Sequence, residues 1–491
     1  MTGPNSTPNR LDRRGLLMGA AGTGAAAGLA VAGPRASSAF AAPNLRQGLT
    51  GTVRVAYADE AGYKPKYVEQ AAQAVQAANP GATVEIDLRQ VAGGDFLTQL
   101  LLEIDGGEGP DVIHLGGDRI GQFADSGFIA PLDDYLAQWP DWAGQYPESV
   151  RSGVTYKGQV WGIPYGLDVR WLYARRDRLE EAGLSRDWQP ANLNGVLEAA
   201  TALKNADLGI EPYVLYAGII GSGGTTTHGF LPVLLANGGT LLTEDGKWVS
   251  DSPAITAAYQ YYVDAWQTLQ VVPTDILTTP EPWKPSRTGI GTGDVAMLFE
   301  GGWVYGGYQA AAAADGSVDL AQIGYSLFPT TEAGPTFTIG GPGTCWYIGA
   351  GSQNPDLAWE FIKAFNTAQI VADLNIEDPH PVARMDAAAL PQFQAQTYLV
   401  DCTDALNAAV FLPVLPELND VSTIVQKITG EIATGDLAAA GAAQRYAEEL
   451  TALVGAENVV SVAERTPLVL GAPGATPIAT PNATPDATPI R

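Results

Sequence analysis

The chain has 491 residues, of which 46% are apolar, so it can bury a large core, and its length suggests two or three domains. It carries 27 Lys and Arg against 53 Asp and Glu, a formal net charge of −26, and a field of that sign repels nucleic-acid phosphates and anionic membranes. We therefore expect no nucleic-acid partner. Cys345 and Cys402 are too few and too far apart for a disulfide framework or a structural zinc site. They either pair in an oxidising compartment or remain buried free thiols.

Residues 1–41 have the features of an export signal. Arg13-Arg14 precedes a weakly hydrophobic Ala/Gly run, and Ala39-Phe40-Ala41 has the small-x-small form that signal peptidase needs. The paired arginines resemble a twin-arginine signal, although Asp12 stands where that signal usually has Ser or Thr. We expect a mature chain that begins near Ala42 and is periplasmic or extracellular, associated with the cell envelope. No later stretch has about 18 or more consecutive apolar residues, so no transmembrane helix is expected.

The C-terminal segment is a repeat. From Ala475 the chain reads ATPI, ATPN, ATPD, ATPI, and a Pro at every fourth position removes hydrogen-bond donors and blocks helix. Residues 466–491 are therefore predicted to be a disordered Pro/Thr/Ala-rich tail. It is either an arm that holds the protein near the envelope or an inert extension.

The folded part begins with alternating strands and helices. The spacing predicts strands over 52–60, 83–91 and 111–115, and helices over 65–79 and 95–104, the second with Asp95 at its N-cap. Strand, helix, strand, helix and strand in this order predict a parallel sheet with helices on both faces.

Ligands of such sheets bind at the carboxyl ends of the strands. Asp59 and Glu60 end the first strand, and Asp118 and Arg119 follow the third. We predict that these four residues contact a ligand. Asp118 alternatively caps the following helix, and because a carboxylate has two oxygens it can do both.

Six later segments carry a resemblance to a known family. The residues are GPDVIHLGGDRIGQFADSGFIAPLDDYL, YKGQVWGIPYGLDVRWLYARRDRLEEAGL, LPVLLANGGTLLTEDGKWV, GDVAMLFEGGWVYGGY, IGYSLFPTTEAGPTFTIGG and GSQNPDLAWEFIKAF, in this order. Together they resemble the family 1 extracellular solute-binding proteins of bacterial ABC importers, the maltose-binding type. The resemblance covers nearly the whole mature chain.

This resemblance implies an α/β fold of the two-lobed periplasmic-binding-protein type (type II), with a hinge that the chain crosses three times and the ligand in the interlobe cleft. The first lobe would hold residues 50–166 and about 346–398, and the second about 167–345 and 399–465. The resemblance also implies a monomer that captures a carbohydrate, without a cofactor or metal, and delivers it to the transmembrane permease subunits of an ABC transporter.

Aromatic faces that stack on a pyranose and polar groups that bind its hydroxyls are the usual devices for holding a sugar. Tyr165 follows Pro164, whose ring fixes φ, so Tyr165 either contacts the ligand or packs in the hinge. Asp168 and Arg170 are one strand period apart and face the same way. They either contact the ligand or pair with each other.

The segment Glu300-Gly301-Gly302-Trp303 stands where the family carries Gly-Pro-Trp, whose indole stacks on a sugar ring. The resemblance therefore implies that Trp303 stacks on the ligand and that Glu300 contacts it, although Gly302 in place of Pro loosens the turn. His228 falls near the family's ligand-touching tyrosine. It is either a ligand contact or a histidine whose hydrogen bonds are satisfied within the protein.

Two further positions bear on the ligand. Gly341, within Gly340–Gly343, and Trp346 lie at the second crossing, where glycine lets backbone N–H groups approach a ligand. Maltose binders carry a Trp just after a Pro-x-x-Pro segment, whereas this chain has Asn419-Asp420-Val421-Ser422 there. Because a stacking platform is replaced by polar groups, we expect a ligand other than maltose.

A catalytic alternative remains open at this stage. If the fold brings Asp59 and Asp168 within about 5–9.5 Å of each other, they have the chemistry that glycoside hydrolysis needs. The chain has no Gly-x-Ser-x-Gly, no His-Glu-x-x-His and only three His, so we expect a binding protein that is not an enzyme. A secreted carbohydrate-active hydrolase and a polyol- or polyamine-binding protein are the alternatives.

Overall fold

The computed structural model describes residues 45–59, 61–90, 93–331, 334–411, 414–465 and 468. The predicted export signal, Glu60 and the ATPx repeat lie outside the described residues. The described residues belong to one compact unit. No helix in these ranges is long and apolar enough to cross a membrane.

The strands form two principal sheets, of order β2-β1-β3-β12-β6 and β10-β7-β9, and three two-stranded pairs, β11-β13, β14-β8 and β4-β5. Their bounds are β1 Thr50–Ala58, β2 Gly81–Arg89, β3 Val112–Gly116, β4 Thr155–Tyr156, β5 Gln159–Val160, β6 Ile163–Pro164, β7 Arg170–Arg175, β8 Trp248–Asp251, β9 Met297–Gly301, β10 Ile323–Ser326, β11 Thr338–Gly340, β12 Thr344–Ile348, β13 Ala409–Phe411 and β14 Val459–Ser461.

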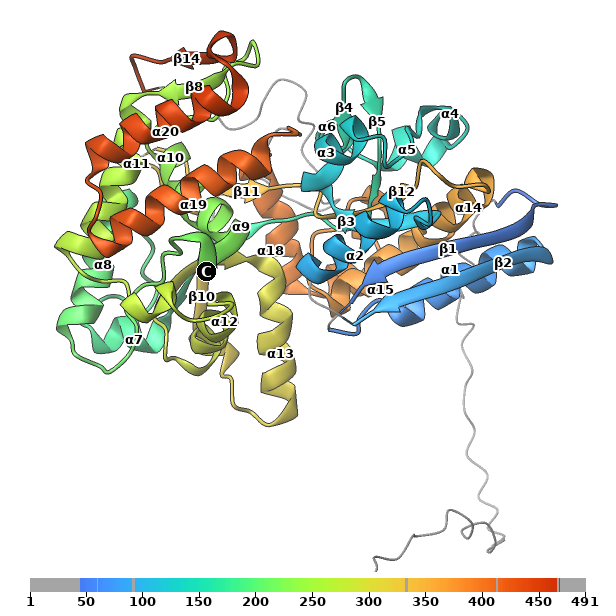
Figure 1. The fold of residues 1–491 in the computed structure, drawn as a ribbon. Coiled ribbons are helices and arrows are strands. Elements are labelled where there is room, and N and C mark those ends of the chain that lie inside the picture. The colour runs from blue at the N-terminus through green and yellow to red at the C-terminus, as the bar shows by residue number, and fades with distance from the viewer. Residues whose placement is uncertain are drawn as a thin grey trace, which may run out of the picture. The chain divides into compact units, whose positions relative to one another are not determined.

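The helices surround these sheets (Figure 1). Their bounds are α1 Pro65–Ala78, α2 Gly93–Asp105, α3 Ile120–Asp125, α4 Asp133–Leu136, α5 Pro140–Gln145, α6 Glu148–Ser152, α7 Arg176–Glu181, α8 Leu193–Asn205, α9 Ser222–Gly224, α10 Leu231–Ala236, α11 Pro253–Val263, α12 Trp283–Thr292, α13 Tyr305–Ala314, α14 Pro355–Phe365, α15 Ala368–Glu377, α16 Met385–Ala388, α17 Pro391–Gln394, α18 Thr397–Ala405, α19 Leu418–Thr434 and α20 Ala439–Val454.

The N-terminal elements follow the sequence pattern closely. β1 pairs in parallel with β2 and with β3, which confirms the predicted parallel sheet. The helix predicted over 95–104 is α2, but it begins at Gly93, so Asp95 lies inside it and is not its N-cap. β12, where the chain returns from the second sheet, then extends the first sheet by antiparallel pairing with β3 on one side and with β6 on the other.

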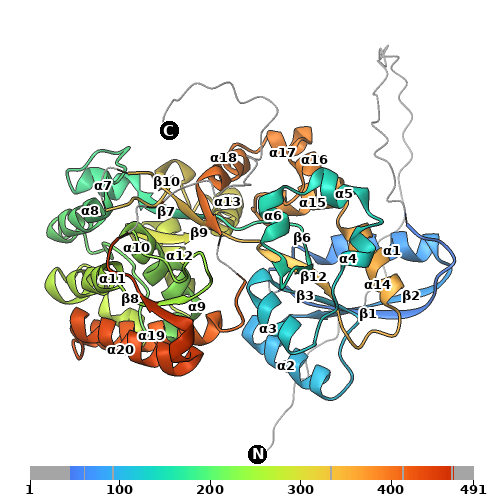
Figure 2. The same cartoon turned by 90° about the horizontal axis from the view of Figure 1, so that it is seen from above.

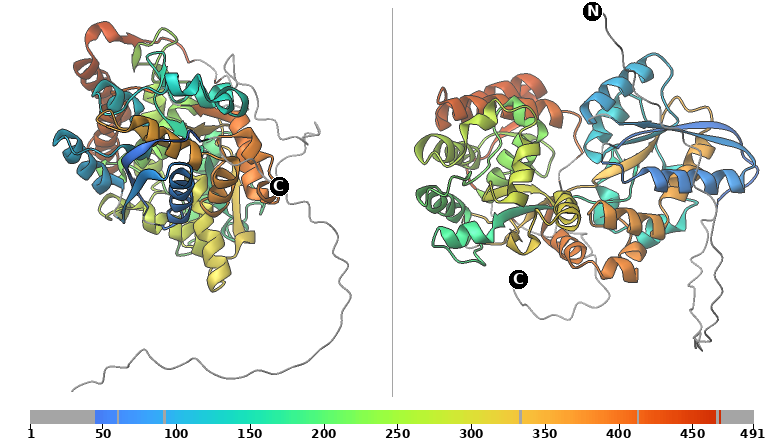
Figure 3. Two further views of the ribbon diagram at one scale, coloured as in Figure 1. Left: turned by 90° about the vertical axis from the view of Figure 1, so that its right-hand side faces the viewer. Right: turned by 90° about the horizontal axis from the view of Figure 1, so that it is seen from below.

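Helices cover both faces of the first sheet, as predicted. α1 and α14 pack against each other on one face, while α2 and α3 lie on the other (Figures 2 and 3). The buried side chains Val53, Val55, Ile113 and Ile348 lie between these layers. This core fixes the carboxyl end of β3, and with it the position of the residues that follow that strand.

The second sheet carries its own helices. β7 pairs antiparallel with both β10 and β9, and its six residues are all buried. α11, α19 and α20 pack together beside it (Figure 1). Cys345 on β12 and Cys402 on α18 are both buried and free, so the second of the two alternatives for the cysteines holds in this structure.

Three segments of chain run side by side where the two sheets meet. Leu167 N donates to Pro381 O (2.7 Å), Asp168 N to Gly341 O (3.0 Å) and Ala383 N to Tyr165 O (3.1 Å). One segment joins β6 to β7, one joins β11 to β12, and the third leads from α15 towards α16. Because backbone hydrogen bonds tie the three together, they form a narrow joint between the two halves of the fold.

Candidate functional site

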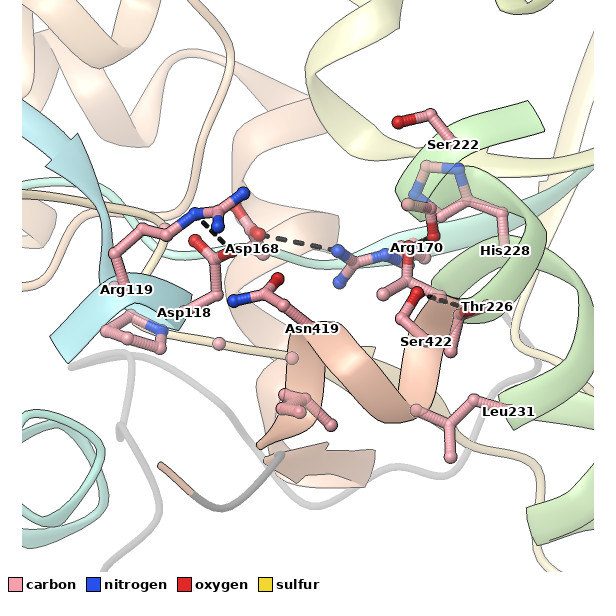
Figure 4. A pocket seen from close by; sticks show the side chains of 18 of the residues that line it. Asp118, Arg119, Asp168, Arg170, Ser222, Thr226, His228, Leu231, Asn419 and Ser422 are labelled. Carbon is pink, nitrogen blue, oxygen red and sulfur yellow. Dashed lines mark hydrogen bonds and ion pairs between the residues drawn. The ribbon is translucent and has the colours of Figure 1, made fainter. Parts of the chain in front are cut away.

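A pocket of about 610 Å³ opens beside this joint (Figure 4). Its walls come from the end of β3, the joint itself, the segment before α10, the turn after β9 and the first half of α19. The lining residues are Gly117, Asp118, Arg119, Gly153, Asp168, Arg170, Ser222, Gly223, Thr226, Thr227, His228, Leu231, Trp303, Gly340, Gly341, Pro342, Gly343, Val414, Leu418, Asn419, Ser422, Thr423 and Gln426.

Asp118 and Arg119 form the wall on the side of the first sheet. They occupy a 3-10 turn, Gly117–Arg119, that directly follows β3. Neither this turn nor α3 has a side-chain cap, so the Asp118 carboxylate remains in the pocket, 3.4 Å from Nε of Arg119. Their side chains are 54% and 29% exposed, respectively, which leaves both able to exchange partners with a ligand.

Asp168 and Arg170 form the floor at the joint. The two side chains face the same way, as their spacing predicts, and Nη2 of Arg170 lies 3.5 Å from Oδ2 of Asp168. Arg170 also donates from Nη1 to the backbone oxygen of Ile339 (2.8 Å). Because Arg170 is 8% exposed and doubly held, its guanidinium is fixed before any ligand arrives.

Trp303 supplies the pocket's aromatic surface. It lies in a 3-10 turn, Gly302–Val304, and its ring is partly buried. A Cβ on Gly301 would lie 2.2 Å from the indole, so the ring folds back over a residue that must lack a side chain. Arg170 Cζ lies 5.5 Å from the ring centroid. The indole therefore lies against Gly301 and near the Arg170 guanidinium.

Glu300 lies behind His228 as seen from the pocket. His228 belongs to a π-helical segment, Thr225–Phe230, and lines the pocket. Its Nδ1 lies 3.0 Å from Oε1 of Glu300, which is fully buried. Glu300 also accepts from Nε of Arg287 (3.0 Å). This placement corrects the prediction that Glu300 contacts the ligand, because the imidazole stands between its carboxylate and the cavity.

The first half of α19 lines the opposite wall with polar groups. Asn419, Ser422, Thr423 and Gln426 lie on one face of the helix at helical spacing. The Ser422 and Thr226 hydroxyls are 2.6 Å apart (Figure 4). The sequence pointed to polar groups at Asn419 and Ser422, whereas Thr423, Gln426 and Thr226 were missed. Extending the helical period by one turn would have found the first two.

Three predicted ligand contacts lie elsewhere. Asp59 is buried and accepts from the backbone N–H groups of Gly62 (3.0 Å) and Lys64 (2.7 Å), so it stabilises the turn before α1. Tyr165 is buried, with its hydroxyl 2.9 Å from Nε2 of His114. Trp346 is 0% exposed in the middle of the first sheet. The structure corrects all three predictions, while Glu60 lies outside the described residues.

The carboxylates of the pocket are held in ion pairs. The carboxylate pair considered for hydrolysis, Asp59 and Asp168, is not formed, because Asp59 does not line the pocket. The two carboxylates that do line it each lie within 3.5 Å of an arginine nitrogen. Within the described ranges, no group of three or more His, Cys, Asp or Glu could hold a metal ion. Fold and pocket together define a two-lobed α/β binding protein.

The comparison with known families agrees. Residues 58–372 match the family of bacterial extracellular solute-binding proteins, and the chain belongs to this family. Its fold is that of the two-lobed periplasmic binding proteins. An ABC transporter solute-binding protein from Thermotoga lettingae, solved with α-D-tagatose, superposes with a TM-score of 0.71 at 23% identity, over 83% of this chain and all of that one.

Two relatives show how far the similarity extends. A binding protein of Brucella abortus is 25% identical over 388 residues, which cover 78% of this chain and 89% of the relative. The maltotriose-binding protein of Pyrococcus abyssi is 22% identical over 343 residues, 69% of each chain. Both similarities span most of the described residues and are not confined to one motif.

Proposed function

We propose that this chain is the exported solute-binding subunit of an ABC importer, that it captures a carbohydrate and that it passes the sugar to the transmembrane permease subunits. The observation that carries the proposal is the pocket itself, in which one accessible indole, Trp303, faces a ring of hydroxyl, amide and ion-paired groups. Stacking on a pyranose and hydrogen bonding to its hydroxyls need this combination. Relatives named for maltotriose binding and solved with tagatose support the same class of ligand.

The pocket's charge argues for a neutral ligand. Asp118 is matched by Arg119, and Asp168 by Arg170, so the walls provide no surplus of carboxylates for a polyamine. The cavity is within the usual range for small-molecule sites, about 300–1,000 Å³. We infer a neutral, hydroxyl-rich solute and no chemical step.

Lobe closure is the mechanism we propose. The first lobe would comprise residues 50–166 and about 346–398, and the second about 167–345 and 399–465. A ligand held by Asp118 on one side and by Trp303 and α19 on the other contacts both lobes. Its binding energy therefore favours the closed state over an open state that lacks half of these contacts.

A thermal-shift screen of the chain from residue 42 tests the proposal. D-tagatose, maltose, maltotriose, a polyol and a polyamine are added separately, because a solute that binds only the folded state raises the melting temperature. We expect at least one sugar to raise it and the polyamine to have no effect. Chromatography of the incubated sugar should return it intact. Turnover that is lost in Asp168→Asn would instead establish a hydrolase.

A further inference from the structure

His228 is held from behind by a group that can only accept hydrogen bonds. Glu300 is fully buried, and its carboxylate accepts from the backbone N–H of Gly301 (2.7 Å), from Arg287 (3.0 Å) and from the hydroxyl of Tyr216 (3.3 Å). Burial opposes its ionisation, but the positive charges of Arg287 and, at low pH, of protonated His228 outweigh burial and hold the pKa of Glu300 well below its usual range. Glu300 is therefore a carboxylate with no proton to donate.

The imidazole in front of it is neutral near pH 7. Burial is the main cause that lowers the pKa of His228, and the charges of Arg170 and Arg287 add to it, while Glu300 opposes the shift. Two aromatic rings also lie beside it, those of Tyr216 and Trp303, at centroid distances of 6.4 and 6.1 Å. A neutral imidazole carries one proton, and the nitrogen that faces a carboxylate is the one that retains it.

The two ring nitrogens thus have different surroundings. Nδ1 is shielded from solvent and lies 3.0 Å from Oε1 of Glu300, an ion-pair distance without the alignment of a hydrogen bond. The ring reaches the pocket with its opposite edge (Figure 4). With the proton on Nδ1, the remaining nitrogen, Nε2, has a lone pair and no hydrogen.

We propose that Glu300 is a positioning residue that fixes His228 in the Nδ1–H tautomer, so that Nε2 accepts a hydrogen bond from a hydroxyl of the bound sugar. This inference rests on the proposed function, and it adds a rule of specificity. A sugar hydroxyl can donate to Nε2, whereas a ring oxygen, a methoxy group or a deoxy position in the same place cannot. His228 therefore selects a free hydroxyl at one position of the ligand.

The tautomer can be measured without any ligand. The chain has three histidines, His114, His228 and His380, so long-range ¹H–¹⁵N spectra of ¹⁵N-histidine protein are assigned by the single variants His114→Gln and His380→Gln. At pH 7 we expect His228 as the Nδ1–H tautomer. In Glu300→Gln, both tautomers should be populated. An Nε2–H tautomer or an imidazolium in the wild type would overturn the inference, and so would an unchanged single tautomer in Glu300→Gln.

Two substitutions of His228 distinguish a role in sugar recognition from a purely structural role. The amide of Gln reaches the position of Nε2, while that of Asn stays near Nδ1. With D-tagatose and maltotriose as probes in calorimetry, we expect His228→Asn to bind about tenfold more weakly, the worth of about one hydrogen bond, and His228→Gln to recover most of this loss. The reverse order would mean that His228 serves only as a partner of Glu300, and it would overturn the proposal.

The pH dependence of sugar affinity provides a third test of the proposal. Protonation converts Nε2 from acceptor to donor, and the pKa of His228 lies below its ordinary value of 6.5. Affinity should therefore be level from pH 8 to about 6.5 and fall below that, a fall that disappears in His228→Gln. An identical decline in both proteins would contradict the proposal. If neither probe binds the wild type, the proposed sugar function fails for these sugars, while the ligand-free spectra still decide whether Glu300 fixes the tautomer.

Discussion

The rings of Trp303 and His380 stack with their centroids 5.7 Å apart and their planes 10° apart. Trp303 follows β9 in the second sheet, while His380 follows α15 in the segment that runs along the joint. The pocket's aromatic surface is therefore backed by a residue from the other side of the joint. This contact links the position of the indole to the arrangement of the two halves of the fold.

Removing the indole should weaken sugar binding much more than folding. If Trp303 stacks on a pyranose, Trp303→Ala should cost about 1–3 kcal/mol of binding free energy, which is roughly a 5- to 150-fold loss of affinity in calorimetry. Because the ring is only partly buried, the ligand-free melting temperature should change little. Trp303→Phe, which keeps an aromatic face, is the control. A steep loss of apo stability with unchanged affinity would disprove the stacking assignment.

His380 should act through Trp303. We expect His380→Ala to reduce sugar affinity about two- to tenfold, since an aromatic pair contributes about 0.5–1.5 kcal/mol, and His380→Phe to preserve it. The decisive measurement is a double-mutant cycle: in the Trp303→Ala background, His380→Ala should have no further effect. Additive losses would show that His380 contributes independently of the indole.

Gly343 at the joint should not tolerate a side chain. Its φ is +54°, and a Cβ would lie 2.7 Å from the backbone oxygen of Gly166. Gly343→Ala should therefore lower the free energy of unfolding by about 1–3 kcal/mol in denaturant titration. The matched control is Gly307→Ala in α13, where a Cβ would meet nothing within 4 Å, and it should be neutral or slightly stabilising. Equal effects of the two substitutions would refute this account.

Acid should destabilise the fold through His114. Burial, followed by the charge of Lys64, holds the pKa of His114 well below its ordinary value of 6.5. The unfolded chain thus takes up a proton as the pH falls below about 6.5 while the native chain does not, so stability falls by up to about 1.4 kcal/mol per pH unit.

The control for this effect is His114→Gln. The variant should be less stable at pH 7, since it loses the contact with Tyr165, but it should lose less stability between pH 7 and pH 5 than the wild type in denaturant titrations. His228 remains in the variant, and its pKa is also lowered, so the slope should shrink without vanishing. An unchanged slope would show that His114 already titrates normally in the native state.

Neither cysteine should react in the native state. Burial raises the pKa of Cys402 to about 12 and that of Cys345 still further, and the thiolate is the reactive form. A thiol reagent at pH 8 should label both residues only after unfolding. Rapid labelling of either residue in native protein would contradict the buried, protonated thiols.

The sequence by itself determined the local elements and some local geometry. Strand and helix periodicity placed β1, α1, β2 and β3, because these segments alternate two clear periods between strong turn signals. The period of two also predicted that Asp168 and Arg170 face the same way, and they form the ion pair that was one of the two alternatives for them. Asp118 and Arg119 were accessible for another reason: they follow the third strand, and ligands of parallel sheets bind at the carboxyl ends of the strands.

Only the tertiary structure decided which polar and aromatic side chains face the cavity. Tyr165, Trp346 and Asp59 have the right chemistry and stand near the joint, but the packing of the first sheet buries them. Glu300 lies next to Gly301 and Trp303 in sequence, yet His228, which belongs to a different element, stands between it and the pocket. His380 reaches Trp303 only because the third segment of the joint folds beside the first. Periodicity fixes the direction of a side chain relative to its own element, whereas its exposure depends on what long-range packing places in front of it.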